Sequence, residues 1–123
     1  MHVPTVTDEM LEKVLQAAAS PVVVEITSCS RECSRSRRWM EDIAEDFDDR
    51  FIFLRVFEEE NPTVVKQYGV TVFPSMIIFK RGAHNRPQIE FSRHEGDLDA
   101  QTIRGALEAA KNGRSNADDY EVA

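Results

Sequence analysis

Two cysteines separated by three residues are the side chains in this sequence most suited to covalent chemistry. Cys29 and Cys33 lie in "TSCSRECSRSRR", between an apolar run and an amphipathic stretch. Such a pair can exchange with disulfides, bind a metal, or consist of two ordinary thiols. A metal site is the weakest interpretation, because C-x3-C supplies two ligands and the histidines at 2, 84 and 94 fall in separate segments. We expect no metal and no bound cofactor.

The place of the pair in the chain favours a reactive thiol. A thiolate at a helix N-terminus is stabilised by free backbone N–H groups and by the helix dipole, and nearby arginines add to this. Residues four apart in a helix have Cα atoms about 6 Å apart, which is within the disulfide range of about 4.4 to 6.8 Å. The alternative is that Cys29 is an exposed bystander and Cys33 a small buried hydrophobe.

The elements around the pair predict an α/β fold. "PVVVEIT", 21–27, is β-branched with little alternation, which is typical of a central strand covered on both faces. The other expected elements are a helix over 8–19 capped by Thr7, a helix from 33 onward, a strand over 51–57, a short helix within 61–70, strands over 74–82 and 88–94 joined by a polar turn, and a helix over about 97–111. Parallel pairing and a closing hairpin give a central mixed sheet with helices on both faces. Sites in such folds lie beyond the carboxyl ends of the strands, where the cysteines fall.

Composition limits the function classes. The chain has 123 residues, enough for one domain over 1–111, followed by a polar tail over 112–123 that we expect to be disordered. A net charge of −7 argues against nucleic acid as a partner. The short apolar runs and the lack of a signal-like start predict a cytoplasmic protein without a membrane span, and we expect a monomer. Two cysteines are too few for a disulfide scaffold, so any disulfide is transient.

Over residues 5–111 the chain resembles the thioredoxin family. The order and spacing of "PVVVEIT", the Cys-bearing helix start, "NPTVVKQYGV" and the last amphipathic helix are similar, and "YGVTVFPSMIIFKRG" is the most specific segment. The resemblance implies a thioredoxin-like fold. It also implies that Pro74, after Phe73, is cis and lies against the cysteines, where both residues would contact substrate.

The sequence departs from that family at the cysteines. Thioredoxins resemble one another in W-C-G-P-C, whereas this chain has "SCSREC". Counted back from the following helix, Cys33 holds the family's resolving position and Ser30 the attacking one. Counted from the strand, the segment is one residue short, so the first cysteine is displaced to Cys29. The sequence leaves open whether the loop places Cys29 where the nucleophile belongs.

Glu25 is the second chemical candidate. It interrupts an apolar strand, and thioredoxins similarly carry a buried acid there that handles protons for the resolving cysteine. Burial disfavours the carboxylate, raises its pKa and suits it to proton exchange near neutrality. The alternative is a glutamate at the sheet edge that points to solvent.

An arginine cluster follows the first cysteine. Arg31, Arg35 and Arg38 share one helix face, with Arg37 beside them. In one interpretation this is a solvated face, with Arg38 and Arg37 paired to Asp42 and Glu41 one turn on. In the other, Arg31 and its neighbours bind an anionic partner, either an acidic protein surface or glutathione.

The leading hypothesis is thiol–disulfide exchange with a protein substrate. Cys29 would attack the substrate disulfide, Cys33 would resolve the mixed disulfide, and Glu25 would move protons. Pro74 would present its backbone to the bound peptide. The alternative is a redox-inactive thioredoxin-fold adaptor, as in phosducin-like and related chaperone-assisting proteins, which the missing W-C-G-P-C favours.

Overall fold

The structure, a computed structural model, describes residues 3–81, 88–96 and 98–112. Its elements are α1 (Asp8–Ala17), β1 (Val22–Thr27), α2 (Arg31–Phe47), β2 (Ile52–Phe57), α3 (Pro62–Gln67), β3 (Ser75–Arg81), β4 (Gln88–Glu95) and α4 (Ala100–Asn112). This order of helices and strands is the predicted one. The turn expected between the last two strands, and the expected tail beyond residue 112, lie outside the described residues.

The four strands form one mixed sheet in the order β2-β1-β3-β4. β1 is parallel to β2 and antiparallel to β3, and β3 and β4 form the expected antiparallel hairpin pairing. Every residue of β1, from Val22 to Thr27, is buried. The prediction of a central strand covered on both faces is therefore confirmed.

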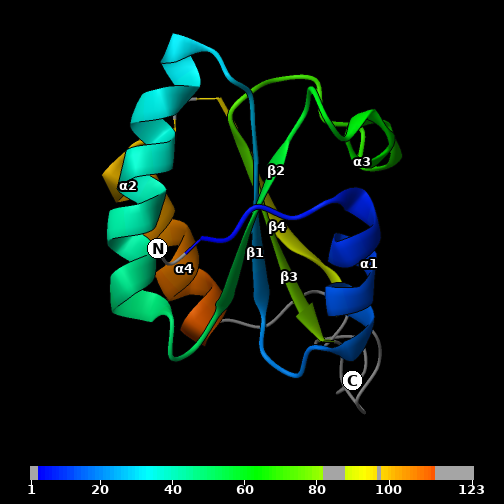
Figure 1. The fold of residues 1–123 in the computed structure, drawn as a ribbon. Helices are drawn as coiled ribbons and strands as arrows, with labels where there is room; N and C mark the ends of the chain where they lie inside the picture. The colour runs from blue at the N-terminus through cyan, green and yellow to red at the C-terminus, as the bar shows by residue number, and fades with distance from the viewer. Residues whose placement is uncertain (1–2, 82–87, 97, 113–123) are drawn as a thin grey trace.

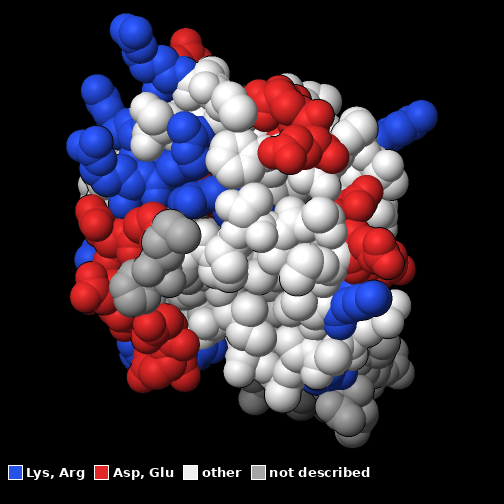
Figure 2. Space-filling view, in the orientation of Figure 1, with Lys and Arg blue, Asp and Glu red and all other residues white. Residues whose placement is uncertain are grey.

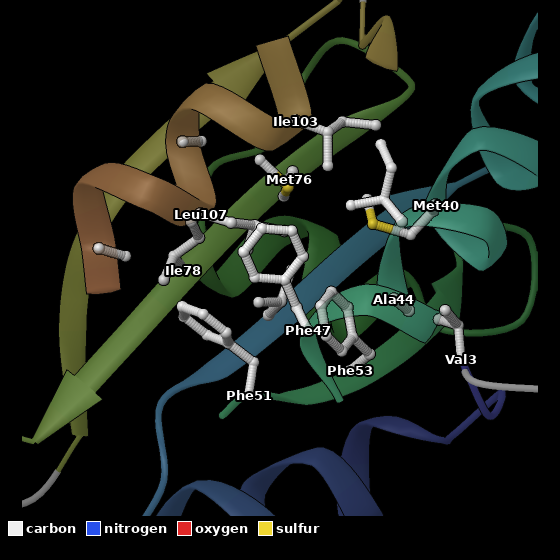
Figure 3. Close-up of a cluster of buried hydrophobic side chains, with 14 of the residues drawn as sticks. Val3, Met40, Ala44, Phe47, Phe51, Phe53, Met76, Ile78, Ile103 and Leu107 are labelled. Carbon is white, nitrogen blue, oxygen red and sulfur yellow. The ribbon is translucent and has the colours of Figure 1, made fainter. Parts of the chain in front are cut away.

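Helices cover both faces of this sheet, with α2 and α4 on one side and α1 and α3 on the other (Figure 1). Successive side chains of β1 alternate between two cores, so Val23 joins the core under α2 and α4 while Val24 joins the core under α1. Figure 3 shows the first core, in which Met40 and Phe47 of α2 meet Ile103 and Leu107 of α4 over the strands.

The apolar stripe of α2 explains where the redox candidates sit. The buried residues of this helix are Cys33, Ser36, Met40, Ile43, Ala44 and Phe47, and all but Ser36 belong to the apolar face that helical spacing in the sequence predicts. Because this stripe packs on the sheet beside β1, the first turn of α2 is held just beyond the carboxyl end of that strand. None of the described helices is long and apolar enough to cross a bilayer.

Helix ends that differ from the prediction do so at capping contacts, and α2 begins at Arg31 rather than 33 because Ser30 is its N-cap. The first helix ends at Ala17 rather than 19, and the carbonyl of Ala18 accepts hydrogen bonds from Arg81 Nε (3.1 Å) and Gln88 Nε2 (3.0 Å). The last helix begins at 100 rather than 97, because Asp99 Oδ1 caps it by accepting the Thr102 N–H at 2.8 Å.

Candidate redox site

The site lies where β1 ends and α2 begins, the place predicted for it. Ser30 is the N-cap of α2, with an extended backbone and a side-chain Oγ that accepts the Cys33 N–H at 3.4 Å. Ser30 thus holds the position that the count from the helix assigns to the attacking cysteine. Cys29 is the residue before this N-cap and lies outside the helix.

The two cysteines differ in exposure as the assigned roles require. Cys29 is exposed, whereas Cys33 is 1% exposed, and both are free thiols. The backbone N–H of Cys29 donates to Glu59 Oε2 at 2.9 Å, and this hydrogen bond lowers the pKa of Glu59. The contact ties the cysteine loop to the turn that follows β2.

The sulfur of Cys33 is surrounded by hydroxyl groups. Ser28 donates from Oγ to Cys33 Sγ at 3.2 Å, and Ser30 Oγ lies 2.9 Å from Ser28 Oγ. Burial by itself would raise the pKa of Cys33, but hydrogen bonds from Ser28, Ser30 and Thr27 outweigh it and lower that pKa. Cys33 is therefore a buried thiol whose ionised form is stabilised by its neighbours.

Glu25 is buried under α2, as predicted. Its exposure is 0%, which rules out the alternative of a glutamate pointing to solvent. Burial raises its pKa to about 7, although Arg55, which bonds Oε1, opposes the rise. Its second oxygen, Oε2, is buried and has no hydrogen-bond partner among the described residues. Such a carboxyl group exchanges protons near neutral pH.

Sequence reasoning missed Arg55 as part of this site. Its Nε lies 2.6 Å from Glu25 Oε1, its Nη1 lies 3.3 Å from Glu41 Oε2, and its Nη2 donates to the carbonyl of Arg37 at 3.1 Å. The sequence feature that could have identified Arg55 is its charge within the apolar run "FIFLRVF". Such a residue needs a buried partner, and the strand register supplies it by placing Arg55 opposite Glu25.

Arg37 holds the loop that carries the cysteines. Its guanidinium donates to the carbonyl of Ser28 and to Thr27 Oγ1, and it stacks 5.5 Å from the centre of the Phe57 ring. These contacts fix the end of β1 against the first turns of α2. Arg37 is thus a structural member of the arginine cluster.

The other arginines of the cluster face solvent. Arg31, Arg35 and Arg38 are exposed, and their side chains form no ion pair within the described part of the chain. The predicted Arg38–Asp42 salt bridge is therefore wrong. Two exposed side chains gain little by pairing and lose conformational freedom, which explains why this contact does not form.

The peptide bond between Phe73 and Pro74 is cis, as the family resemblance implied. Both residues line a cavity of about 240 Å³ together with Glu32 and Ser36 of α2, and with Gly96 and Leu98. Ser36 is one of the buried residues of α2, and Glu32 directly precedes Cys33. The cavity therefore lies between the Pro74 turn and the helix that carries Cys33.

Among the described residues, no group of three His, Cys, Asp or Glu side chains is placed to hold a metal ion. His2 and His84 lie outside the described residues, and His94 is in β4.

Comparison with known proteins decides the family. The family model for thioredoxin matches residues 2–108. The chain belongs to the thioredoxin family. Thioredoxin 1 of Synechococcus elongatus is 30% identical over 79 residues, which cover 63% of this chain and 73% of that protein. Chloroplastic thioredoxin M4 of Arabidopsis thaliana is 33% identical over 85 residues, which cover 67% of this chain and 43% of the relative.

Solved thioredoxin structures share the fold. Chloroplastic thioredoxin z superposes with a TM-score of 0.77 at 22% identity, over 92% of this chain and 97% of that one. The thioredoxin of Malassezia sympodialis gives a TM-score of 0.71 at 18% identity, over 86% of this chain and 88% of its own. Family and fold together support thiol–disulfide exchange as the general type of function.

Proposed function

We propose that the protein is a thiol–disulfide oxidoreductase that acts on protein disulfides through Cys29 and Cys33. The observation that carries the proposal is the pairing of an exposed thiol with a buried, hydroxyl-bonded thiol at the end of the central strand. An exposed sulfur is accessible to a bulky disulfide, whereas a buried sulfur can react only with a group already attached nearby. Cys29 therefore has the attacking role and Cys33 the resolving role.

The exchange proceeds in two steps. The Cys29 thiolate attacks one sulfur of the substrate disulfide, forming a mixed disulfide and releasing the first substrate thiolate. The Cys33 thiolate then attacks the Cys29 sulfur, forming the Cys29–Cys33 disulfide and releasing the second substrate thiolate. The substrate gains two electrons, which the two cysteines lose.

Glu25 supplies the proton transfer in this scheme. Cys33 must lose its proton before it attacks, and Glu25 lies on the face of β1 that α2 covers. Its pKa of about 7 lets it accept a proton in one direction and return it in the other. Ser28, whose hydroxyl contacts Cys33 Sγ, stabilises the thiolate that results.

The cavity beside Pro74 is the proposed binding site of the substrate peptide. Phe73 and Pro74 line it on one side and Glu32 on the other, next to Cys33. Pro74 cannot donate from its nitrogen, and its carbonyl already accepts the Gly96 N–H at 2.9 Å. Backbone contacts to a peptide would therefore come from the residues around Pro74 as well as from the second lone pair of its carbonyl.

One observation favours a second function, that of a redox-inactive adaptor. Ser30 occupies the N-cap position, where the family's attacking cysteine is expected, and Cys29 stands outside the helix. A chain that has lost its nucleophile can still use the same surface to bind partners. The adaptor hypothesis predicts that partner binding survives the loss of either sulfur.

Trapping of a mixed disulfide distinguishes the oxidoreductase from the redox-inactive adaptor. In the Cys33→Ser variant, Cys29 should form a mixed disulfide with a model protein disulfide that persists, because no resolving thiol remains. The Cys29→Ser variant is the matched control and should trap nothing. Failure of the wild-type protein to form an internal disulfide under any redox poise would remove the two-cysteine mechanism and favour the adaptor.

A further inference from the structure

The surface around Cys29 carries opposite charges on its two sides. Figure 2 shows a basic patch over α2 and an acidic patch across the same edge of the molecule, over the segment that follows β2. The basic side is formed by Arg31, Arg35 and Arg38, and the acidic side by the turn Glu58–Glu60. A local excess of arginine is unexpected in a chain with a net charge of −7.

The basic side also carries one carboxylate, that of the exposed Glu32, which the arginines outnumber. Arg31, Arg35 and Arg38 are exposed and form no ion pair within the described residues. Cations in the first turns of a helix also oppose its dipole, so Arg31, Arg35 and Arg38 weaken α2 slightly without forming an ion pair with another described residue. Residues that weaken their own helix and form no stabilising contact within the protein are expected at surfaces that have a function.

The acidic side is attached directly to the cysteine loop. Glu59 Oε2 accepts the Cys29 N–H at 2.9 Å, and Arg31 follows Cys29 by two residues. Cys29 thus lies between the two charged sides. A polypeptide that places its disulfide at Cys29 would meet arginines in one direction and carboxylates in the other.

We infer that the preferred substrates are protein segments in which acidic residues flank the disulfide-bonded cysteine on one side only. The acidic residues lie on Arg31, Arg35 and Arg38, and the Glu58–Glu60 turn repels the reversed orientation. Complementary charges at the rim of an interface raise the rate of productive encounter, and like charges suppress the wrong orientation. A nucleic acid fits this surface less well, because a phosphate chain crossing Cys29 would run into the acidic turn. This inference rests on the proposed oxidoreductase function and defines its substrate class.

The test uses three disulfide-linked peptides of equal length. One has acidic residues only before its cysteine, the second has them only after it, and in the third they are replaced by Asn and Gln. The reduced full-length protein should reduce one of the two acidic peptides about fivefold faster than the neutral one. It should reduce the other acidic peptide more slowly than the neutral one. Both differences should vanish in about 1 M salt, where the screening length falls to about 3 Å.

Two charge-reversal variants test whether the arginines of α2 produce this peptide preference. Arg35→Glu should slow reduction of the favoured acidic peptide more than reduction of the neutral peptide, so that the preference is lost. Lys13→Glu makes the same change of charge at an exposed position of α1 and should keep the preference. Equal rates for the two acidic peptides, or an equal loss on the neutral peptide in Arg35→Glu, would overturn this inference while leaving the oxidoreductase function intact. Reduction of none of the three peptides would overturn the proposed function itself.

Discussion

Arg55 lies directly opposite Glu25 in the β1–β2 ladder, and its Nε donates a hydrogen bond of 2.6 Å to Glu25 Oε1. The same guanidinium contacts Glu41 and the carbonyl of Arg37, so it joins the central strand to α2. It leaves Glu25 Oε2 without a partner among the described residues. A carboxyl group held at one oxygen keeps the other available for a proton.

Removing Arg55 should show how strongly the buried Glu25 carboxylate destabilises the fold when it has no counter-charge. In Arg55→Met the Glu25 carboxylate loses its counter-charge, so its pKa should rise further and the free energy of unfolding should fall by about 3 kcal/mol near neutral pH. Urea denaturation measures this loss. The loss should shrink in acid, where Glu25 is protonated in both proteins, and Arg55→Lys, which keeps the charge, should lose less. A loss that is the same in acid and at neutral pH would show that Arg55 acts through packing alone.

The raised pKa of Glu25 makes stability depend on pH in a defined direction. Between the ordinary value of 4.5 and the folded value of about 7, the folded protein holds a proton that the unfolded chain has released. The free energy of unfolding must therefore fall as pH rises through this range, by about 3 kcal/mol in total from this group. Glu25→Gln removes the titration. The stability of wild type minus that of Glu25→Gln should decline from about pH 4.5 to pH 7 and then level off, and a flat difference would contradict the raised pKa.

Much of the fold could be predicted because its strongest signals are local. The run "PVVVEIT" lacks the alternation of a half-exposed strand, and β1 is indeed central. The spacing of Met40, Ile43 and Phe47 is also a local signal, and it correctly predicted the buried face of α2. Apolar residues that recur at helical spacing lie on the side of the helix that packs on the core.

The details of the site depend on contacts between distant residues, which the sequence does not display. Cys29 is held by Glu59, thirty positions away along the chain, so counting along the loop could not place it. Arg55 and Glu25 each interrupt an apolar strand, but only the register shows that the two interruptions face each other. The count from the helix put the family's attacking position at Ser30, and in the structure Ser30 is the N-cap of α2.

The hydroxyl of Ser28 should control the ionisation of Cys33. Ser28→Ala removes the hydrogen bond of 3.2 Å to Cys33 Sγ, so burial should dominate and the pKa of Cys33 should rise. The ultraviolet absorbance of the thiolate, followed across pH in the Cys29→Ser background, measures that pKa. Ser34→Ala is the control, because Ser34 is exposed and its hydroxyl donates to the carbonyl of Arg31 instead. An unchanged titration in Ser28→Ala would mean that this hydroxyl does not stabilise the thiolate.

The two thiols should differ in their rates of alkylation. Cys29 is exposed and Cys33 is 1% exposed, so iodoacetamide should label Cys29 first in the native reduced protein. Peptide mass spectrometry at short times measures the order. In urea the two rates should converge, because the burial of Cys33 is lost. Equal labelling of the native protein would contradict the assigned roles.

Moving the first thiol by one position tests what the cap at Ser30 means for function. In the double variant Cys29→Ser with Ser30→Cys, the first sulfur takes the N-cap position and the spacing to Cys33 becomes that of the family's C-x-x-C. The sulfur would then lie near the free N–H groups of the first turn of α2, one of which now bonds Ser30 Oγ at 3.4 Å. Reduction of a model protein disulfide should rise about tenfold or more over wild type, because a thiolate at that position is better stabilised as nucleophile and leaving group. The single variant Cys29→Ser is the control and should show only background reduction. If the double variant is no faster than wild type, Cys29 already performs the attack from outside the helix, and the atypical spacing imposes no loss of activity.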